Sequence, residues 1–200
     1  MKRRPYGPAA WILDDVADPA GVALSIRSAS LGGVQDVIPA ESSIVVICQL
    51  GASAAIGERL DHFEPTGVGA DSGEAFTIDV VYDGDDLGAV AEATGLSVAE
   101  VVSRHHSGTY RVAFCGFSPG FGYLSGLDPM LHVPRRDAPR TRVPAGTVAI
   151  AAGYSAVYPA ASPGGWHLIG TTSVTLWDTD SDPPAALWPG RHVRFRQVDP

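Results

Sequence analysis

Residues 110–126 read YRVAFCGFSPGFGYLSG, and the character of the chain changes at this stretch. Its first part, Tyr110–Phe117, is apolar and aromatic and predicts a buried strand. Its second part is rich in glycine, which predicts tight turns. Helix signals nearly vanish after Gly108, and Gly and Pro then separate short strand candidates at Val148–Ala152, Trp166–Thr171, Val174–Trp177 and His192–Gln197. This spacing predicts a closed β-barrel or a sandwich.

Helix signals are concentrated before this stretch. Asp18 followed by Pro19 predicts the start of a helix over Ala20–Ser30. Ser97 and Glu100 have the spacing of a capping box and predict another over Val98–His106. Two further helices are predicted over Ala52–His62 and over Leu87–Thr94, the latter capped by Asp85 or Asp86.

The strand candidates in this part are Ala10–Leu13, Val34–Ile38, Ser43–Gln49 and Phe76–Tyr82. Together with the first two helices they give the order β-α-β-β-α-β, which is typical of a ferredoxin-like domain. The last of these strands could equally open the next domain. We therefore expect an α+β protein: a small ferredoxin-like α/β domain over residues 1–75 and a β-barrel domain over residues 76–200.

The composition indicates a folded chain with an uneven charge. Hydrophobic residues make up 45% of the 200 residues, and the formal net charge is −8, which argues against a nucleic-acid-binding surface. Residues 1–103 hold 5 basic and 16 acidic side chains, whereas residues 104–200 hold 9 basic and 6 acidic ones. The two halves are therefore expected to do different jobs.

Several chemistries are disfavoured by what the sequence lacks. No apolar run approaches the roughly 20 residues of a membrane span, and the first residues lack the apolar core of a signal peptide, so we expect a cytoplasmic protein. A single lysine, Lys2, disfavours Schiff-base chemistry and a phosphate-loop lysine. Cys48 and Cys115 lie in apolar runs and are predicted to be buried free thiols. No Cys or His spacing predicts a metal site.

A strip of four arginines is the clearest candidate for ligand binding. Arg135, Arg136, Arg140 and Arg142 lie between prolines that keep the segment extended, so Arg140 and Arg142 could converge on one anion. The alternative is a solvated or interface strip that faces an acidic partner, including the acidic half of this chain.

Two glycine-rich segments with aromatic residues are further candidates. One contains Gly120, Phe121 and Tyr123, and the other contains Gly164, Gly165 and Trp166. Glycine lets the backbone approach a ligand closely, but both segments could instead be structural turns packed by their own aromatic rings. Residues 116–120 match the G-x-S-x-G pattern of serine hydrolases, yet Pro119 has no N–H for the oxyanion hole, so we discard that interpretation.

A general acid or base is the remaining requirement for catalysis. Of the six histidines, His105 is our candidate, because it lies just before the strand that leads into the glycine-rich loop.

Three ordered motifs together resemble a known family. They are FCGFSPGFGYL at residues 114–124, the proline- and arginine-rich segment at residues 134–146, and the segment from Tyr158-Pro159 to Gly170. The resemblance is to the B-type subunit of 5-oxoprolinase, also called allophanate hydrolase subunit 1, and to KipI-type kinase inhibitors. The C-terminal part also resembles the carboxyltransferase region of urea carboxylase.

This resemblance implies a cyclophilin-like barrel in the C-terminal domain. It implies a hydrolase subunit of an ATP-dependent complex that opens 5-oxoproline to glutamate, with little activity in this chain alone. The implied partners are a larger cyclophilin-like subunit, of the kind called the C-type subunit of 5-oxoprolinase or allophanate hydrolase subunit 2, and in some members a third TIM-barrel-like subunit. ATP is expected to bind in the complex, without a metal site on this chain.

One departure from the family pattern bears on the substrate. A Gln-Thr-Gly segment that is common in the family is replaced here by Tyr154-Ser155-Ala156, so Tyr154 is a further candidate ligand contact and another lactam or amide could be the substrate. Other implied functions are a KipI-like inhibitor of a histidine kinase and a carboxyltransferase-like module that needs a biotin carrier. Proline isomerisation rests on fold likeness alone.

Overall fold

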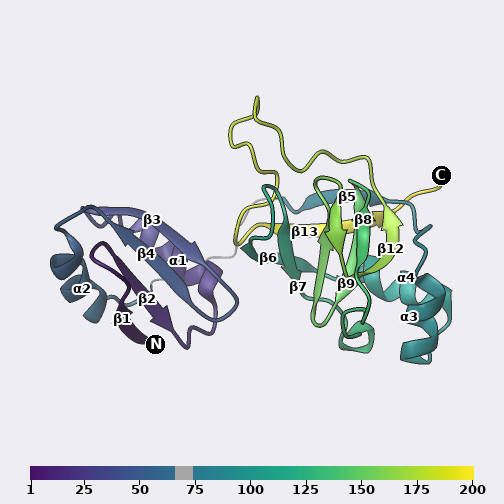
Figure 1. Cartoon of the computed structure of the whole chain (residues 1–200), viewed down its shortest axis with the longest axis horizontal. Helices are drawn as coiled ribbons and strands as arrows, with labels where there is room; N and C mark the ends of the chain where they lie inside the picture. The colour runs from purple at the N-terminus through teal and green to yellow at the C-terminus, as the bar shows by residue number, and fades with distance from the viewer. Residues whose placement is uncertain (66–73) are drawn as a thin grey trace. The chain divides into compact units, whose positions relative to one another are not determined.

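The computed structural model describes residues 1–65 and 74–200, and the chain forms two compact units, residues 1–72 and 73–200. Figure 1 shows the helices and strands of both units. Each unit has its own sheet and its own hydrophobic core, and each is described separately.

The first unit is a four-stranded antiparallel sheet with two helices. Its strand order is β1-β2-β4-β3. The elements are β1 Lys2–Pro5, β2 Ala10–Asp14, α1 Pro19–Ser28, β3 Val34–Pro39, β4 Ile44–Cys48 and α2 Ser53–Asp61. The strand β1, which the sequence did not predict, takes the sheet edge beside β2 where the last strand of a β-α-β-β-α-β unit would lie.

Alternating burial explains how this sheet holds its helices. In β4, Ile44, Val46 and Cys48 are buried and share one core with side chains of α1 and α2, so both helices cover the same face. The α1 helix begins as predicted, because the Asp18 carboxylate accepts a hydrogen bond of 3.0 Å from the Gly21 amide.

The second unit is built on a seven-stranded sheet that nearly closes into a barrel. Its strand order is β12-β9-β10-β7-β6-β13-β5. Val81, after β5, and Thr171, the last residue of β12, exchange two backbone hydrogen bonds of 2.9 and 2.8 Å, which joins the two sheet edges. The sheet strands are β5 Phe76–Val80, β6 Tyr110–Cys115, β7 Gly122–Ser125, β9 Thr147–Ala151, β10 Tyr154–Val157, β12 His167–Thr171 and β13 His192–Gln197.

The remaining elements of this unit add to the sheet. A two-stranded ribbon consists of β8 Arg140–Val143 and β11 Ser162–Gly164. The helices are α3 Leu87–Thr94, α4 Val98–Ser107 and the 3-10 turn η1 Pro129–Leu131. The capping box of Ser97 and Glu100 forms as predicted at the start of α4. Among the described residues, no helix is long and apolar enough to cross a membrane.

Both faces of the sheet are buried at its centre. In β9, Val148 and Ile150 contribute to the main core, which α3 and α4 also join. The alternate residues Ala149 and Ala151 belong to a second cluster, rich in aromatic side chains, on the opposite face. This second cluster contains four of the predicted site residues: Phe121, Tyr123, Tyr154 and Trp166.

Phe76–Val80 pairs with β13 in the second sheet, so this strand opens the second unit, which is one of the two placements that the sequence left open. Two other sequence predictions need correction. Val174–Trp177 does not form a strand, and within residues 74–200 it makes only one bridge, between Trp177 and Ala185. Cys115 lies at the end of β6 and is exposed, whereas Cys48 is buried as predicted.

Closure of the barrel predicts a sharp effect of one methyl group. A Cβ at Gly170 would lie 2.6 Å from the Val81 carbonyl oxygen, so we expect Gly170→Ala to destabilise the protein by about 1–3 kcal/mol in urea unfolding. The matched control is Gly88→Ala in α3, where a Cβ would meet no atom of the described residues within 4 Å. This substitution should raise the free energy of unfolding by about 0.5–1 kcal/mol. An unchanged urea midpoint for Gly170→Ala would contradict this account of closure.

Candidate functional site

Aromatic rings gather on the outer face of the barrel sheet. Phe121 is central, and its ring meets the rings of Tyr123, Tyr158 and Trp166 edge to face at centroid distances of 5.1, 5.3 and 5.8 Å. Tyr154 extends the cluster, because its ring lies 5.8 Å from that of Tyr123. The cluster thus contains four predicted site residues, together with Tyr158, which was not predicted.

The glycine-rich loop that leads into Phe121 carries backbone strain at an exposed aromatic residue. Phe117 has φ of +70°, a conformation unusual for a side chain of this size, and it is 62% exposed. Gly120 also has a positive φ, of +79°, and a Cβ there would lie 2.9 Å from the Trp177 Cβ. Such strain persists only where the surrounding structure holds it, and it is frequent at binding sites.

The second glycine segment packs against the cluster and the arginine strip. A Cβ at Gly164 would overlap the Tyr158 hydroxyl, so only glycine fits there. The Gly165 carbonyl accepts a hydrogen bond of 2.8 Å from the Arg136 amide. The predicted role of both glycines as backbone donors to a ligand stays a prediction.

Two of the four predicted arginines converge on one buried carboxylate. Arg136 Nη1 donates to Asp86 Oδ1 at 2.7 Å, and Arg140 donates from Nη1 and Nη2 to the two Asp86 oxygens at 2.9 Å each. The Leu168 amide completes the set with a hydrogen bond of 2.8 Å to Asp86 Oδ2. The Asp86 side chain is only 5% exposed, so these four donors compensate for its loss of water.

The electrostatics agree with this geometry. Burial acts to raise the pKa of Asp86, but hydrogen bonds from Arg140 and the Leu168 amide, with the charges of both arginines, hold that pKa below its ordinary value. The same contacts raise the pKa of Arg140. Asp86 and Arg140 are therefore both charged at neutral pH, and Arg136 adds a second guanidinium group to this pair.

The arginine cluster adjoins the aromatic cluster. Burial raises the pKa of Tyr158, while the positive charges of Arg135 and Arg140 act to lower it. A Cβ at Gly165, next to Trp166, would lie 3.5 Å from Pro139 Cβ, on the arginine segment. We call the combined surface the aromatic–arginine face; its residues are Phe121, Tyr123, Tyr154, Tyr158, Trp166, Asp86, Arg136 and Arg140.

The remaining arginines are placed differently from the prediction. Arg140 and Arg136 bind the same anion, the Asp86 carboxylate, whereas the prediction had Arg140 and Arg142 converge on one anion. Arg142 and Arg135 are exposed. Arg136 and Arg140 thus face a carboxylate within this chain, and the anion-binding role of the four arginines stays a prediction.

Asp86 is the residue of this cluster that sequence reasoning missed. It was predicted as the cap of α3, and it does occupy the N-cap position, but its side chain makes no capping hydrogen bond. The carboxylate turns toward the arginines instead. The only sequence signal was an acidic pair before a helix, which local rules assign to capping.

His105 lies in the core of the barrel, away from the aromatic–arginine face. It is 0% exposed, and its Nδ1 and Nε2 atoms lie 2.7 Å from the Tyr82 hydroxyl and 2.8 Å from Ser155 Oγ. Ser155 in turn donates to the Ala149 carbonyl at 3.4 Å. All donors are used if Tyr82 donates to Nδ1 and Nε2–H donates to Ser155, which assigns a neutral imidazole.

Burial lowers the pKa of His105 to about 3, with a further contribution from His106. The acid–base role of His105 stays a prediction, and its contacts give it a structural role in joining α4 to β10. Among the residues that the structure describes, no group of three His, Cys, Asp or Glu side chains could hold a metal ion.

Comparison with known proteins places this chain in a class. The profile described as "Carboxyltransferase domain, subdomain C and D" matches residues 14–187, and the chain belongs to this family. Among its relatives is the B-type subunit of 5-oxoprolinase from Escherichia coli O157:H7, which is 43% identical over 178 residues, or 86% of this chain and 82% of the relative. These matches confirm the family resemblance carried by the sequence motifs.

Solved structures agree with this assignment. The crystal structure of TTHA0988 superposes with a TM-score of 0.83 at 33% identity over 96% of this chain, which spans only 40% of that longer chain. A conserved uncharacterized protein, PH0987 from Pyrococcus horikoshii, matches with a TM-score of 0.62 at 32% identity and covers 99% of this chain and 98% of its own. The same architecture therefore occurs both alone and as part of a longer chain.

Removal of the buried carboxylate charge tests the arginine cluster. We expect Asp86→Asn to destabilise the protein by about 2–3 kcal/mol in urea unfolding, because two guanidinium groups lose their shared partner. Asp85→Asn is the matched control, since Asp85 is an exposed neighbour and its change should stay within about 0.5 kcal/mol. Equal effects of the two substitutions would contradict the role given to Asp86.

The buried imidazole predicts a pH dependence with a definite sign. The pKa of His105 is about 3 in the folded protein and about 6.5 in the unfolded chain, so the unfolded chain binds more protons between these values. Stability should therefore fall by about 1.4 kcal/mol per pH unit as the pH drops below about 6.5. His105→Gln should remove this contribution from the slope, whereas His192→Gln, in β13, should retain it; identical slopes for the two variants would refute the assignment.

Proposed function

We propose that this chain is the smaller subunit of an ATP-dependent hydrolase complex that opens a lactam or amide, in the manner of 5-oxoprolinase. The observation that carries the proposal is the aromatic–arginine face, where Asp86 holds Arg136 and Arg140 beside a wall of aromatic rings. The name of the E. coli relative supports the same reaction class.

The charge of the face fits a substrate with one carboxylate. Arg136, Arg140 and Asp86 together carry one excess positive charge. Arg136 Nε is buried and has no hydrogen-bond partner among the described residues, so this donor leaves the site incomplete without an added acceptor. A carboxylate of a small lactam supplies such an acceptor, and the aromatic rings cover the apolar ring carbons of the same molecule.

Each part of the face has a task in this reaction. The guanidinium groups bind and orient the carboxylate, and they also stabilise negative charge as it develops on the amide oxygen. The aromatic wall excludes water from the ring until the amide is activated. Bound in the complex, ATP would supply the phosphoryl group that turns the amide oxygen into a leaving group. Because the arginine pair fits one anionic group, we place the nucleotide on other residues of the complex.

We further propose that a larger partner subunit completes the site. Two observations support this. In TTHA0988 the matched region is joined to further chain, since it covers only 40% of that protein. In this chain the strained Phe117 exposes an aromatic ring at the edge of the aromatic–arginine face, and Trp177, which lies against Gly120 of the same loop, is 39% exposed. A larger cyclophilin-like subunit that covers this edge would bury both rings; a third subunit is compatible with the proposal.

The finer description of the fold belongs to this proposal. We infer that the first unit is a ferredoxin-like domain in which β1 replaces the last strand, and that the second is a cyclophilin-like barrel. The domain boundary falls near residue 75, and a cytoplasmic location fits the ATP requirement.

Reconstitution tests the proposal directly. The chain is co-expressed with the larger-subunit relative from its own genome, and 5-oxoproline and other lactams are assayed for ATP-dependent release of the amino acid. We expect a stable complex that forms one ADP and one phosphate per lactam opened, and negligible turnover by either chain alone. Turnover by this chain alone, or failure of the two chains to co-purify, would overturn the proposal.

The arginine cluster predicts a specific kinetic loss in that complex. Arg136→Gln should lower kcat/KM by about 100-fold or more, because a donor to the substrate carboxylate and to the developing oxyanion is lost. Arg194→Gln, an exposed arginine of β13, is the matched control and should leave kcat/KM within about twofold. Equal kcat/KM values for the two variants would exclude Arg136 from the site.

A further inference from the structure

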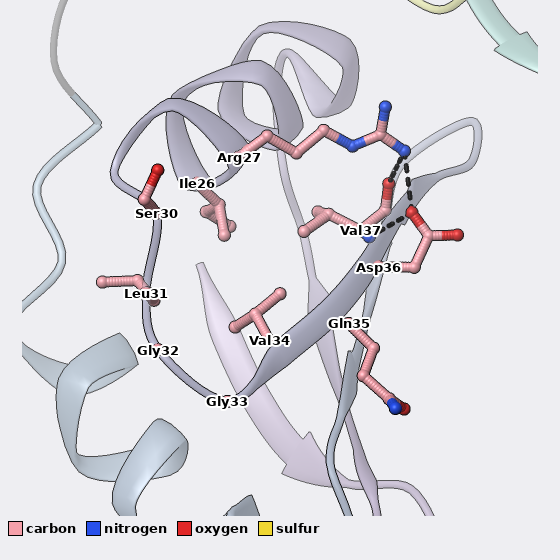
Figure 2. Close-up of a pocket in the computed structure, with 10 residues that line it drawn as sticks. All are labelled: Ile26, Arg27, Ser30, Leu31, Gly32, Gly33, Val34, Gln35, Asp36 and Val37. Carbon is pink, nitrogen blue, oxygen red and sulfur yellow. Dashed lines mark hydrogen bonds and ion pairs between the residues drawn. The ribbon is translucent and has the colours of Figure 1, made fainter.

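A hollow of about 430 Å³ opens in the first unit, between the last turn of α1, residues 29–33 and the start of β3. Figure 2 shows that the side chains of Ile26 and Val34 point into it, with Val37 behind them. Ile26 and Val37 are almost fully buried, so the accessible apolar surface of the hollow comes mainly from the half-buried Val34, which lies against them. A volume of this size suits a single small molecule.

The rim of the hollow presents both signs of charge. Arg27 arches over it, and its Nη2 donates to Asp36 Oδ1 at 2.9 Å and to the Val37 carbonyl at 2.7 Å (Figure 2). The Val37 amide donates to the same Asp36 oxygen at 2.7 Å. Among the described residues, Arg27 Nη1 and Nε and Asp36 Oδ2 take part in no hydrogen bond, so two donor groups and one acceptor remain on this half-exposed ion pair.

The backbone around the hollow is irregular at two places. Ser30 has φ of +46° without being glycine. The pairing of β3 with β4 shifts register between Val34 and Asp36, which leaves Gln35 as an inserted residue. The Ser30 conformation is the common one for the residue after a helix C-cap, whereas β-bulges such as that at Gln35 recur at binding sites, where they aim side chains or backbone at a ligand. Both irregularities lie on the wall of the hollow.

The edge of β3 does not favour an added strand. β3 is an outer strand of its sheet, but the Val37 amide and carbonyl are already bonded to Asp36 and Arg27, and Pro39 has no amide hydrogen. A peptide that pairs along this edge would lose those contacts. The occupant is therefore a small molecule.

We propose that this hollow binds an α-amino acid with a short aliphatic side chain. The carboxylate meets Arg27, the ammonium group meets Asp36, and the side chain rests on Ile26 and Val34. A ligand with one charge matches less well, because an anion faces the Asp36 carboxylate and a cation faces the Arg27 guanidinium. This site is independent of the aromatic–arginine face and goes beyond the function proposed for it.

Titration of the full 200-residue chain tests the proposal. L-leucine and L-valine are added while binding is followed by calorimetry and by amide shifts in ¹⁵N NMR spectra. We expect saturable binding with shifts at Ser30–Val37. Isocaproate lacks the ammonium group, isoamylamine lacks the carboxylate and glycine lacks the side chain, so each should bind about tenfold more weakly or worse.

Variants of the rim provide the second arm. Arg27→Gln and Asp36→Asn should each weaken leucine binding about tenfold or more. Arg4→Gln is the matched control, because Arg4 forms a similar exposed ion pair with Asp14, at 2.8 Å, on another part of the same sheet. Absence of saturable leucine binding to the folded chain, equal binding of isocaproate, or binding that is unchanged in Arg27→Gln would each overturn the proposal.

Discussion

The Asp86 carboxylate is the contact on which the functional face of the second unit depends. A buried carboxylate must replace its lost water with donors, and here the donors come from Arg136, Arg140 and the amide of Leu168. The Asp86 amide also donates to the Leu168 carbonyl at 2.9 Å. One side chain thus joins the start of α3, the arginine segment and β12, and it holds both guanidinium groups in place.

The alternation of side chains along one strand separates the two groups of candidate residues. In β10, Tyr154 belongs to the aromatic–arginine face, whereas its neighbour Ser155 points to the core and contacts His105. The apolar barrel interior holds the His105 imidazole neutral. On the other face Tyr123 and Tyr154 are half-buried, beside the almost fully buried rings of Phe121, Tyr158 and Trp166. The sheet therefore separates a polar chain that stabilises the fold from a surface that can bind a ligand.

Local rules predicted the helices well, because capping depends on neighbours in sequence. The Asp18 cap and the Ser97–Glu100 capping box both form, and the helix bounds agree to within two residues.

Short strands were harder to predict from the sequence, since β7 and β10 have only four residues each and form only because they pair with neighbouring strands. Val174–Trp177 shows the converse, because its apolar sequence predicts a strand but no strand in the described part of the chain pairs along it. The glycine-rich segments did point to aromatic residues that the fold brings together, such as Phe121 and Trp166, but their role as a site stays a prediction. Such segments could not reveal Asp86, whose partners are 50 and 54 residues away. They also could not show that His105 faces inward, because that depends on which side of β10 the α4 helix packs.

The charge of the aromatic–arginine face depends on which side chains the fold places there, and not on the amino-acid composition of the whole chain. The chain carries a net charge of −8, yet the aromatic–arginine face has one positive charge in excess. Exposed acidic groups are screened by salt over about 8 Å, whereas partly buried charges are screened much less. The local charge of this face therefore differs from the net charge of the chain, because Asp86 neutralises one of two neighbouring guanidinium groups and the exposed Asp85 also acts on Arg140.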